Sequence, residues 1–175
     1  MKARVLAILF LVANSLAGQA TPFTDSLLKL DGLPRRASKA QLTQRLGQPT
    51  KSSRARYECG SDYVDSPGHI YYLLRYAQAT YVGNAAEGYE LETVHFAPGG
   101  AVLHYGPATW NASTTLAAVQ KLFGTDAELE KNLVPGTVLV SIAIRLPHTN
   151  QLADSRIHLT FRHGRLVEYT TWDPC

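Results

Sequence analysis

The six histidines are the side chains that most readily suggest metal or acid–base chemistry, and two of them fall close together. His95 and His104 flank the turn sequence P-G-G at 98–100, so we expect them on opposite arms of a β-hairpin. With a two-residue turn the two imidazoles would face each other. A type I turn with a glycine bulge would shift the register, and Phe96 would then face Val102. Because a zinc site needs three or four ligands, we predict no metal site and no cofactor.

The chain has two cysteines, Cys59 and Cys175, so only one intramolecular disulfide is possible. Their separation is 175 − 59 = 116 positions. Closing so long a loop stabilises a fold by about 4–5 kcal/mol in the chain-entropy model. The alternative is that Cys59 is a nucleophile, which requires a neighbouring base that the sequence does not identify. We predict the Cys59–Cys175 disulfide.

Signatures of catalysis are missing from the sequence. It contains no nucleophile elbow, no pair of zinc ligands at helical spacing and no phosphate-binding glycine loop. Asp62 and Asp65 precede a Pro-Gly turn and are typical of a solvated loop rather than a cation site. We therefore predict a protein that is not an enzyme. A secreted hydrolase that uses the histidines and scattered carboxylates is kept as an alternative.

Residues 1–20 have the pattern of a signal peptide. Lys2 and Arg4 precede an apolar run that is too short to span a bilayer, and small residues follow it. No cysteine lies near the expected cleavage site, so we predict a secreted or periplasmic protein without a lipid anchor or stable membrane insertion. Removing the segment leaves 15 Lys and Arg against 14 Asp and Glu, a net charge of +1. No basic stripe remains, so we predict no nucleic-acid partner.

Two helices are predicted from their end signals. Ser38 and Gln41 have capping-box spacing, Leu42 and Leu46 lie one turn apart, and Gly47 ends the predicted helix 38–46. The related sequence S-T-T-L-A-A-V-Q-K-L-F-G predicts a second helix within 113–124.

Alternating residues predict the strands. The clearest pattern spans 137–146, where large apolar residues occupy every second position and a more varied set lies between them. The apolar positions are Val138, Val140, Ile142, Ile144 and Leu146. Further strands are predicted at 69–82, with an interruption near Ala77, and at 89–97, 101–105, 156–162 and 166–172.

The order of these elements suggests an internal repeat. The sequences V-H-F-A-P-G-G-A-V and L-T-F-R-H-G-R-L-V follow the two helices at corresponding places. Each contains an apolar residue, a Phe, a glycine turn and another apolar residue. We predict an α+β fold of two tandem helix-plus-antiparallel-sheet units, 21–106 and 107–175, with the helices packed on one face of a sheet.

A helix that ends in L-G-x-P at Leu46, Gly47 and Pro49, followed by a sheet that closes with F-x-x-G-x-L at 161–166, resembles two groups of exported proteins. These are the SmpA/OmlA outer-membrane assembly lipoproteins and the β-lactamase-inhibitor-like proteins. The tandem arrangement is more similar to the inhibitor type, in which two units form a concave sheet that grips a partner protein. The absence of a lipobox cysteine departs from the lipoproteins, and no inhibitor contact residue matches.

The predicted binding residues lie opposite the apolar stripes of their strands. Arg and Tyr often dominate binding energy at interfaces, although the solvated face of an antiparallel sheet also carries such residues. The set is Tyr71, Arg75, Arg145, Arg156, His158 and Arg162.

The function predicted from these features is binding of another exported protein through the open face of an antiparallel sheet. Two alternatives to this protein-interaction module are kept: a carrier of a small ligand and the secreted hydrolase. A pocket of several hundred cubic ångströms with convergent polar groups would favour a ligand carrier or an enzyme. A solid core with an exposed sheet would favour the interaction module.

Overall fold

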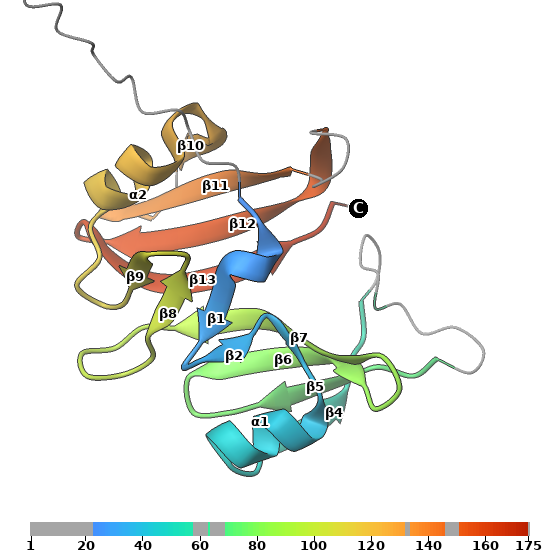
Figure 1. Cartoon of the computed structure of the whole chain (residues 1–175). Helices are drawn as coiled ribbons and strands as arrows, with labels where there is room; N and C mark the ends of the chain where they lie inside the picture. Colours follow the sequence, from blue (N-terminus) through green and yellow to red (C-terminus); the bar gives the residue numbers. More distant parts are fainter. Residues whose placement is uncertain (1–22, 58–62, 64–68, 132–133, 146–150, 175) are drawn as a thin grey trace, which may run out of the picture.

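The computed structural model describes residues 23–57, 63, 69–131, 134–145 and 151–174 (Figure 1). Within these residues the protein is mostly antiparallel β-sheet with two short α-helices. The small sheet has the order β2-β1-β8-β9, formed by β1 (Leu28–Leu30), β2 (Leu33–Pro34), β8 (Leu103–Tyr105) and β9 (Ala108–Trp110).

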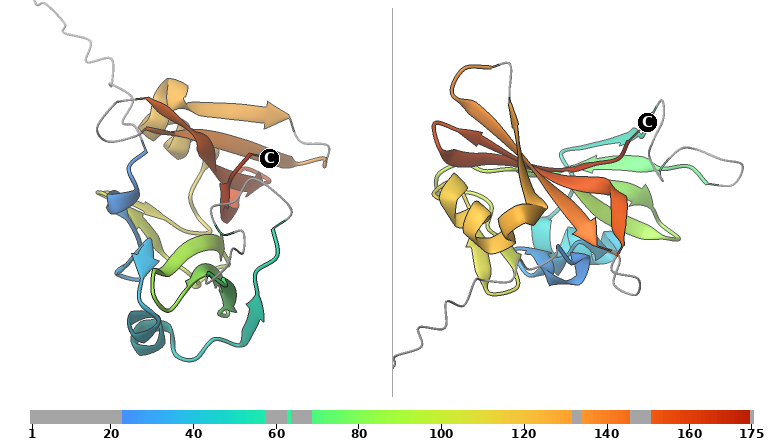
Figure 2. Two further views of the ribbon diagram at one scale, coloured as in Figure 1. Left: turned by 90° about the vertical axis from the view of Figure 1, so that its right-hand side faces the viewer. Right: turned by 90° about the horizontal axis from the view of Figure 1, so that it is seen from above.

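The large sheet has the order β10-β11-β12-β13-β7-β6-β5-β4, and β3 adds to it by pairing with β7. Its strands are β3 (Arg36–Ala37), β4 (Lys51–Arg54), β5 (Tyr72–Arg75), β6 (Ala79–Asn84), β7 (Gly88–His95), β10 (Ala127–Lys131), β11 (Thr137–Arg145), β12 (Leu152–Arg162) and β13 (Arg165–Trp172). In Figure 2, β11–β13 (orange to red) run at a marked angle to β5–β7 (green).

The first helix begins at the predicted cap, and the second begins at Leu116, within the predicted range 113–124. In α1 (Lys39–Leu46) the Ser38 hydroxyl accepts from the Gln41 amide, and the Gln41 side chain accepts from the Ser38 amide. This reciprocal pair satisfies two of the donors that a helix N-terminus leaves without a partner, and it confirms the predicted capping box. In α2 (Leu116–Phe123) the Thr115 side chain accepts a hydrogen bond from the Ala118 amide. Short 3₁₀ turns lie at Asp25–Leu27 and Gly124–Asp126.

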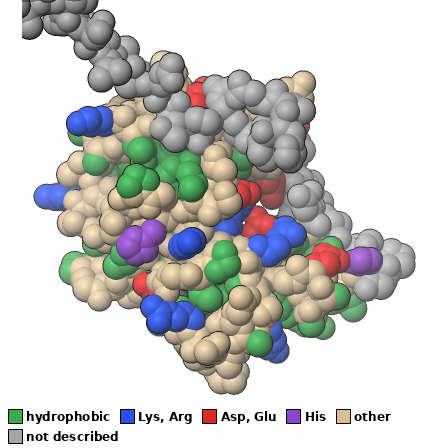
Figure 3. Space-filling model, in the orientation of Figure 1, with side chains coloured by type: hydrophobic (Ala, Val, Ile, Leu, Met, Phe, Trp, Pro, Cys, Tyr) green, Lys and Arg blue, Asp and Glu red, His purple; other side chains and the backbone are tan. Residues whose placement is uncertain are grey.

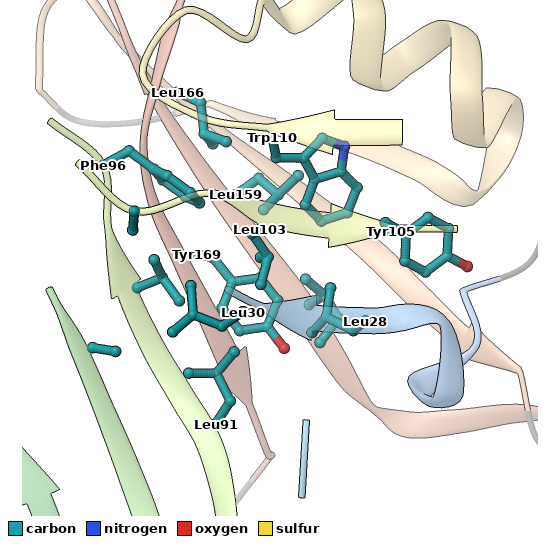
Figure 4. Packing of buried hydrophobic residues seen from close by; sticks show 14 of the residues in the cluster. Leu28, Leu30, Leu91, Phe96, Leu103, Tyr105, Trp110, Leu159, Leu166 and Tyr169 are labelled. Atoms are coloured by element: carbon teal, nitrogen blue, oxygen red, sulfur yellow. The ribbon is translucent and has the colours of Figure 1, made fainter. Parts of the chain in front are cut away.

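The core lies between the two sheets (Figure 4). Leu28, Leu30 and Leu103 of the small sheet are buried in one cluster with Leu159 and Tyr169 of the large sheet. A cluster of four aromatic side chains packs at the end of this core beside α2. Its ring centroids are 5.0 Å apart for Phe23 and Tyr105, 5.4 Å for Tyr105 and Trp110, and 5.3 Å for Tyr105 and Phe123.

The predicted tandem α+β fold is wrong. Strand β13, from the predicted second unit, pairs with β7 from the first, so both regions share one sheet. The 101–105 strand leaves that sheet and pairs instead with the N-terminal strand β1. The helices have only eight residues each and lie at opposite ends of the molecule (Figure 1). The repeat pattern reflected similar local elements, which pair differently in three dimensions.

The predicted hairpin between His95 and His104 is also wrong. His95 lies opposite Glu168 in the large sheet, whereas His104 lies opposite Lys29 and Thr109 in the small sheet. The turn at 98–100 therefore carries the chain from one sheet to the other. The P-G-G sequence predicted a turn correctly, but a turn does not determine which strands pair on its two sides.

The predicted strand 69–82 is interrupted, as expected near Ala77. It forms β5 and β6, which pair antiparallel with Arg75 opposite Thr80. The predictions at 137–146 and 166–172 agree closely with β11 and β13, and the strand predicted at 156–162 is the second half of β12.

Candidate functional site

A fork in the large sheet brings several partly buried charged side chains together. The second half of β7 pairs with β13, where Thr93, Val94 and His95 lie opposite Thr170, Tyr169 and Glu168. The first half of β7 pairs instead with β3, where Glu90 lies opposite Arg36. Strands β13 and β3 thus pair with different parts of the same edge of β7.

Arg35, the residue before β3, fills this fork. Its carbonyl accepts from the Leu91 amide at 2.8 Å, which fixes its backbone beside β7. One Nη atom donates to the Thr171 hydroxyl at 3.3 Å and lies 2.6 Å from a Glu90 carboxylate oxygen. The other Nη atom contacts the Asp25 carboxylate. The guanidinium therefore connects three parts of the chain.

Arg35 keeps its charge although its side chain is only 9% exposed. Burial by itself lowers the pKa of Arg35, but Tyr169 and the two carboxylates outweigh that effect and raise the pKa. Its Nε atom is buried without a hydrogen-bond partner among the described residues. The fork is thus organised around a fixed positive charge.

Glu90 is the main partner of that charge. One carboxylate oxygen contacts Arg35, and the other accepts from an Nη atom of Arg36 and from the Tyr63 hydroxyl, each at 2.7 Å. Burial by itself raises the pKa of Glu90, but the two guanidinium groups and the phenol hold it below its ordinary value of 4.5. Glu90 is therefore ionised and fully engaged near neutral pH.

A second carboxylate lies nearby on the same strand. The Tyr57 hydroxyl donates to Glu92. Burial raises the pKa of Tyr57, and the negative charges of Glu92 and Asp173 raise it further, so the phenol stays protonated and acts as the donor.

These groups line a cavity of about 450 Å³. The described lining residues are Asp25, Arg35, Arg36, Tyr57, Tyr63, Val82, Glu90, Leu91, Glu92, Ile144, Ala153, Ser155, Thr171, Trp172 and Asp173. We call this the fork cavity. In Figure 3, acidic and basic side chains gather beside a hollow near the middle of the molecule. A second hollow, about 500 Å³ between β9 and α2, has Lys121 as the one charged side chain in its described lining.

Three of the predicted binding residues lie on the face of the large sheet that points away from the main core, although Ser141 and Ala143 on that face are buried. Cross-strand pairing places Arg75 of β5 and His158 of β12 in one row. This row runs from β4 to β10 through Lys51, Arg75, Thr80, Thr93, Thr170, His158, Ser141 and Glu128. Arg156 lies in the next row, opposite Ala143 and Trp172.

Arg156 and His158 are engaged by neighbouring side chains. Arg156 forms an ion pair with Glu128 at 3.2 Å. The His158 ring stacks on Trp172 with a centroid distance of 5.5 Å, and its Nε2 atom lies 4.0 Å from Glu130. Burial lowers the pKa of His158, the charge of Glu130 partly opposes this effect, and the charge of Arg156 adds to it.

The other predicted binding residues are placed differently. Tyr71 is buried against Ala55 and Val82, and its hydroxyl donates to Glu87 at 3.0 Å, so it is not part of an open surface. Arg162 is exposed at the end of β12. Arg145 lies opposite Leu152 at the end of β11, and its side chain lies outside the described part of the structure.

Cys59 and Cys175 lie outside the described residues, so the disulfide stays a prediction. Tyr57 and Asp173 each lie two residues from one of these cysteines, and both line the fork cavity. The fold therefore brings the two chain segments that precede the cysteines to one place.

The sequence interpretation missed the fork cavity. Nothing in the sequence around Arg35 predicts that this residue is only 8% exposed. The available signal was in β7, where Glu90 and Glu92 share a strand with buried Leu91 and Val94. Acidic residues repeated within an apolar strand often have buried partners, but they do not reveal which residues those partners are.

The chain matches no family model, no curated protein and no solved structure. The resemblance to the SmpA/OmlA and inhibitor-like proteins therefore stays a prediction from the sequence motifs. None of the described helices is long and apolar enough to cross a membrane. Nor do the described residues contain a group of three His, Cys, Asp or Glu side chains that could hold a metal ion.

Proposed function

We propose that this protein binds a small organic ligand in the fork cavity. The observation that carries the proposal is the convergence of Arg35, Glu90, Glu92 and Tyr57 on one cavity of about 450 Å³. Pockets for small molecules generally have volumes of about 300–1,000 Å³ and a few fixed polar groups among apolar walls. Leu91, Val82 and Ile144 supply apolar wall here.

The polar groups of the cavity are held in place before any ligand arrives. Arg35 has its Asp25, Glu90 and Thr171 contacts, and Glu90 also accepts from Arg36 and Tyr63. Binding to such a site orders few side chains, so little of the interaction free energy is lost to conformational entropy. This favours a binding role for the cavity.

In this proposal the protein is exported and binds its ligand without converting it chemically. The described lining of the cavity contains no His or Cys, and Tyr57 is held as a protonated hydrogen-bond donor. These features support retention of a ligand over acid–base or nucleophilic catalysis. The signal-peptide pattern at 1–20 supports a secreted or periplasmic location.

A ligand screen tests the proposal. Native mass spectrometry and thermal unfolding of the protein against a library of anionic, cationic and neutral small molecules should yield compounds that bind and raise Tm. Replacing Trp172→Ala, at the cavity rim, should weaken binding at least about tenfold, or 1.4 kcal/mol. Tyr72→Ala is the matched control, because Tyr72 and Trp172 are both 41% exposed and Tyr72 does not line the cavity. Failure of the whole library, or equal effects of the two variants, would contradict the proposal.

A second candidate function is contact with another exported protein through the open face of the large sheet. Trp172 favours it, because this large side chain is 41% exposed and stacks on His158 next to Arg156. Tryptophan and arginine side chains frequently anchor interfaces. Replacing Arg145, Arg156 and Arg162 by Ser together should abolish capture of a co-purified partner. Equal capture by the folded triple variant would exclude this face.

A further inference from the structure

The fork cavity has an excess of negative charge. Its described lining contains the guanidinium groups of Arg35 and Arg36, and four carboxylates, those of Asp25, Glu90, Glu92 and Asp173. The balance is 2 − 4 = −2 when all six groups are ionised. A net negative site attracts cations and repels anions.

The excess is concentrated at one side of the cavity. Both guanidinium groups contact Glu90, and Arg35 also contacts Asp25. Among the described residues, no Lys, Arg or His forms an ion pair with Glu92 or Asp173. Glu92 accepts one hydrogen bond from the Tyr57 hydroxyl, and Asp173 is close enough to that phenol to raise its pKa. These two carboxylates therefore have charge available for a ligand.

Aromatic rings accompany the two carboxylates. Trp172 immediately precedes Asp173, and Tyr57 and Tyr63 line the same cavity. The faces of aromatic rings attract ammonium and guanidinium groups, and carboxylates at the same site add charge complementarity. Aromatic walls also bury the apolar body that carries the charged group.

We propose that the ligand of the fork cavity is an organic cation, with an amine, quaternary ammonium or guanidine group attached to an apolar body. This inference rests on the proposed ligand-binding function and specifies the ligand class. The cationic group lies beside Glu92 and Asp173, and the apolar body extends toward Val82, Leu91 and Ile144.

A charge series tests the proposal with fluorescence as the readout. The chain has two tryptophans: Trp172 lines the fork cavity, and Trp110 lines the second hollow between β9 and α2, so a variant without Trp172 identifies which of them responds. The probes are 3-phenylpropyltrimethylammonium, its neutral analogue 4,4-dimethyl-1-phenylpentane, 3-phenylpropionate and calcium chloride. The quaternary cation should bind at least about tenfold more tightly than the neutral analogue. Trp172→Phe should abolish the fluorescence change, and isothermal titration should still detect binding.

Charge-removing variants locate the cation. Glu92→Gln and Asp173→Asn should each weaken binding of the quaternary cation about tenfold, with greater loss in the double variant. Glu168→Gln removes the same charge from β13, outside the cavity, where its ion-pair partner is His95, and should leave the affinity unchanged. Raising the salt concentration should weaken the cation complex of the unchanged protein more than that of the double variant.

The outcomes separate this inference from the proposed function. Equal or tighter binding of the neutral or anionic probe in the fork cavity would overturn the cation proposal and leave the ligand-binding function standing. If calcium binds and the Glu92→Gln variant loses that binding, the ligand is a metal ion and the proposal of an organic cation is wrong. No binding by any probe, together with failure of the broad library, would overturn both proposals.

Discussion

Arg35 shows how one residue can connect distant parts of a chain. Its side chain contacts Asp25, Glu90 and Thr171, and its carbonyl receives the Leu91 amide. Because these partners come from the N-terminal segment, β7 and β13, the guanidinium stabilises the point where β7 changes neighbours. The neighbouring Arg36 shares Glu90, but its side chain is 62% exposed.

Arg35→Met should therefore destabilise the protein by about 3 kcal/mol, because Glu90 and Asp25 lose a buried cationic partner. Arg36→Met is the matched control, with an expected loss of less than about 1 kcal/mol, because solvent screens an exposed pair. Urea unfolding at neutral pH measures both effects. Similar losses in the two variants would show that Arg35 does not have the special role assigned to it.

Glu90 should make stability depend on pH. Its pKa in the folded protein lies below the ordinary value of 4.5, so the unfolded state binds the proton more readily. The stability that Glu90 contributes is therefore fully present above pH 4.5 and is lost as the pH falls through its folded-state pKa. The difference in unfolding free energy between the unchanged protein and Glu90→Gln should shrink below pH 4.5. Urea unfolding between pH 7 and about pH 3 measures it. A constant difference would contradict this assignment.

At the scale of elements, short-range hydrogen bonds determine the helix ends. Ser38 and Gln41 are three residues apart, and their reciprocal bonds require no distant partner. The alternation in β11 and β12 is similarly local, since it places Val140, Ile142 and Leu159 on the core face. Such elements can be predicted because their signals lie within a short stretch of the chain.

Ser38→Ala should destabilise the protein by about 1 kcal/mol, because the Gln41 amide loses its acceptor at the start of α1. Ser38→Asp should retain most of the stability, because a carboxylate can also cap the helix. Chemical unfolding measures both variants, and circular dichroism checks that the rest of the fold is kept. A neutral effect of Ser38→Ala would show that the cap contributes nothing to stability.

At the scale of the whole molecule, the two sheets enclose one core, and the fork in the large sheet produces the cavity. Tyr57 and Asp173 approach this cavity from segments far apart in the sequence. That arrangement is compatible with the predicted bond between Cys59 and Cys175, because each cysteine lies two residues beyond one of these side chains.

The predicted Cys59–Cys175 bond should appear in non-reducing peptide maps of protein purified from an oxidising compartment. Replacing both cysteines by Ser should lower the free energy of unfolding by about 2–5 kcal/mol, because the unfolded chain loses a long-loop constraint. Thermal unfolding of the oxidised, reduced and doubly substituted proteins provides the comparison. Two alkylatable thiols in the purified protein would contradict the prediction.

The sequence by itself determined the local features of this protein: where α1 begins, where strands such as β11 alternate, and where glycine turns occur. Only the tertiary structure decided that β13 joins β7, that β8 joins β1, and that Arg35 lies at the resulting fork. The physical reason is the range of the interactions. A cap or an alternating pattern depends on residues a few positions apart, whereas Arg35 and Thr171 are 136 positions apart. Their proximity depends on how all the strands pack around one core, and a short stretch of sequence cannot predict it.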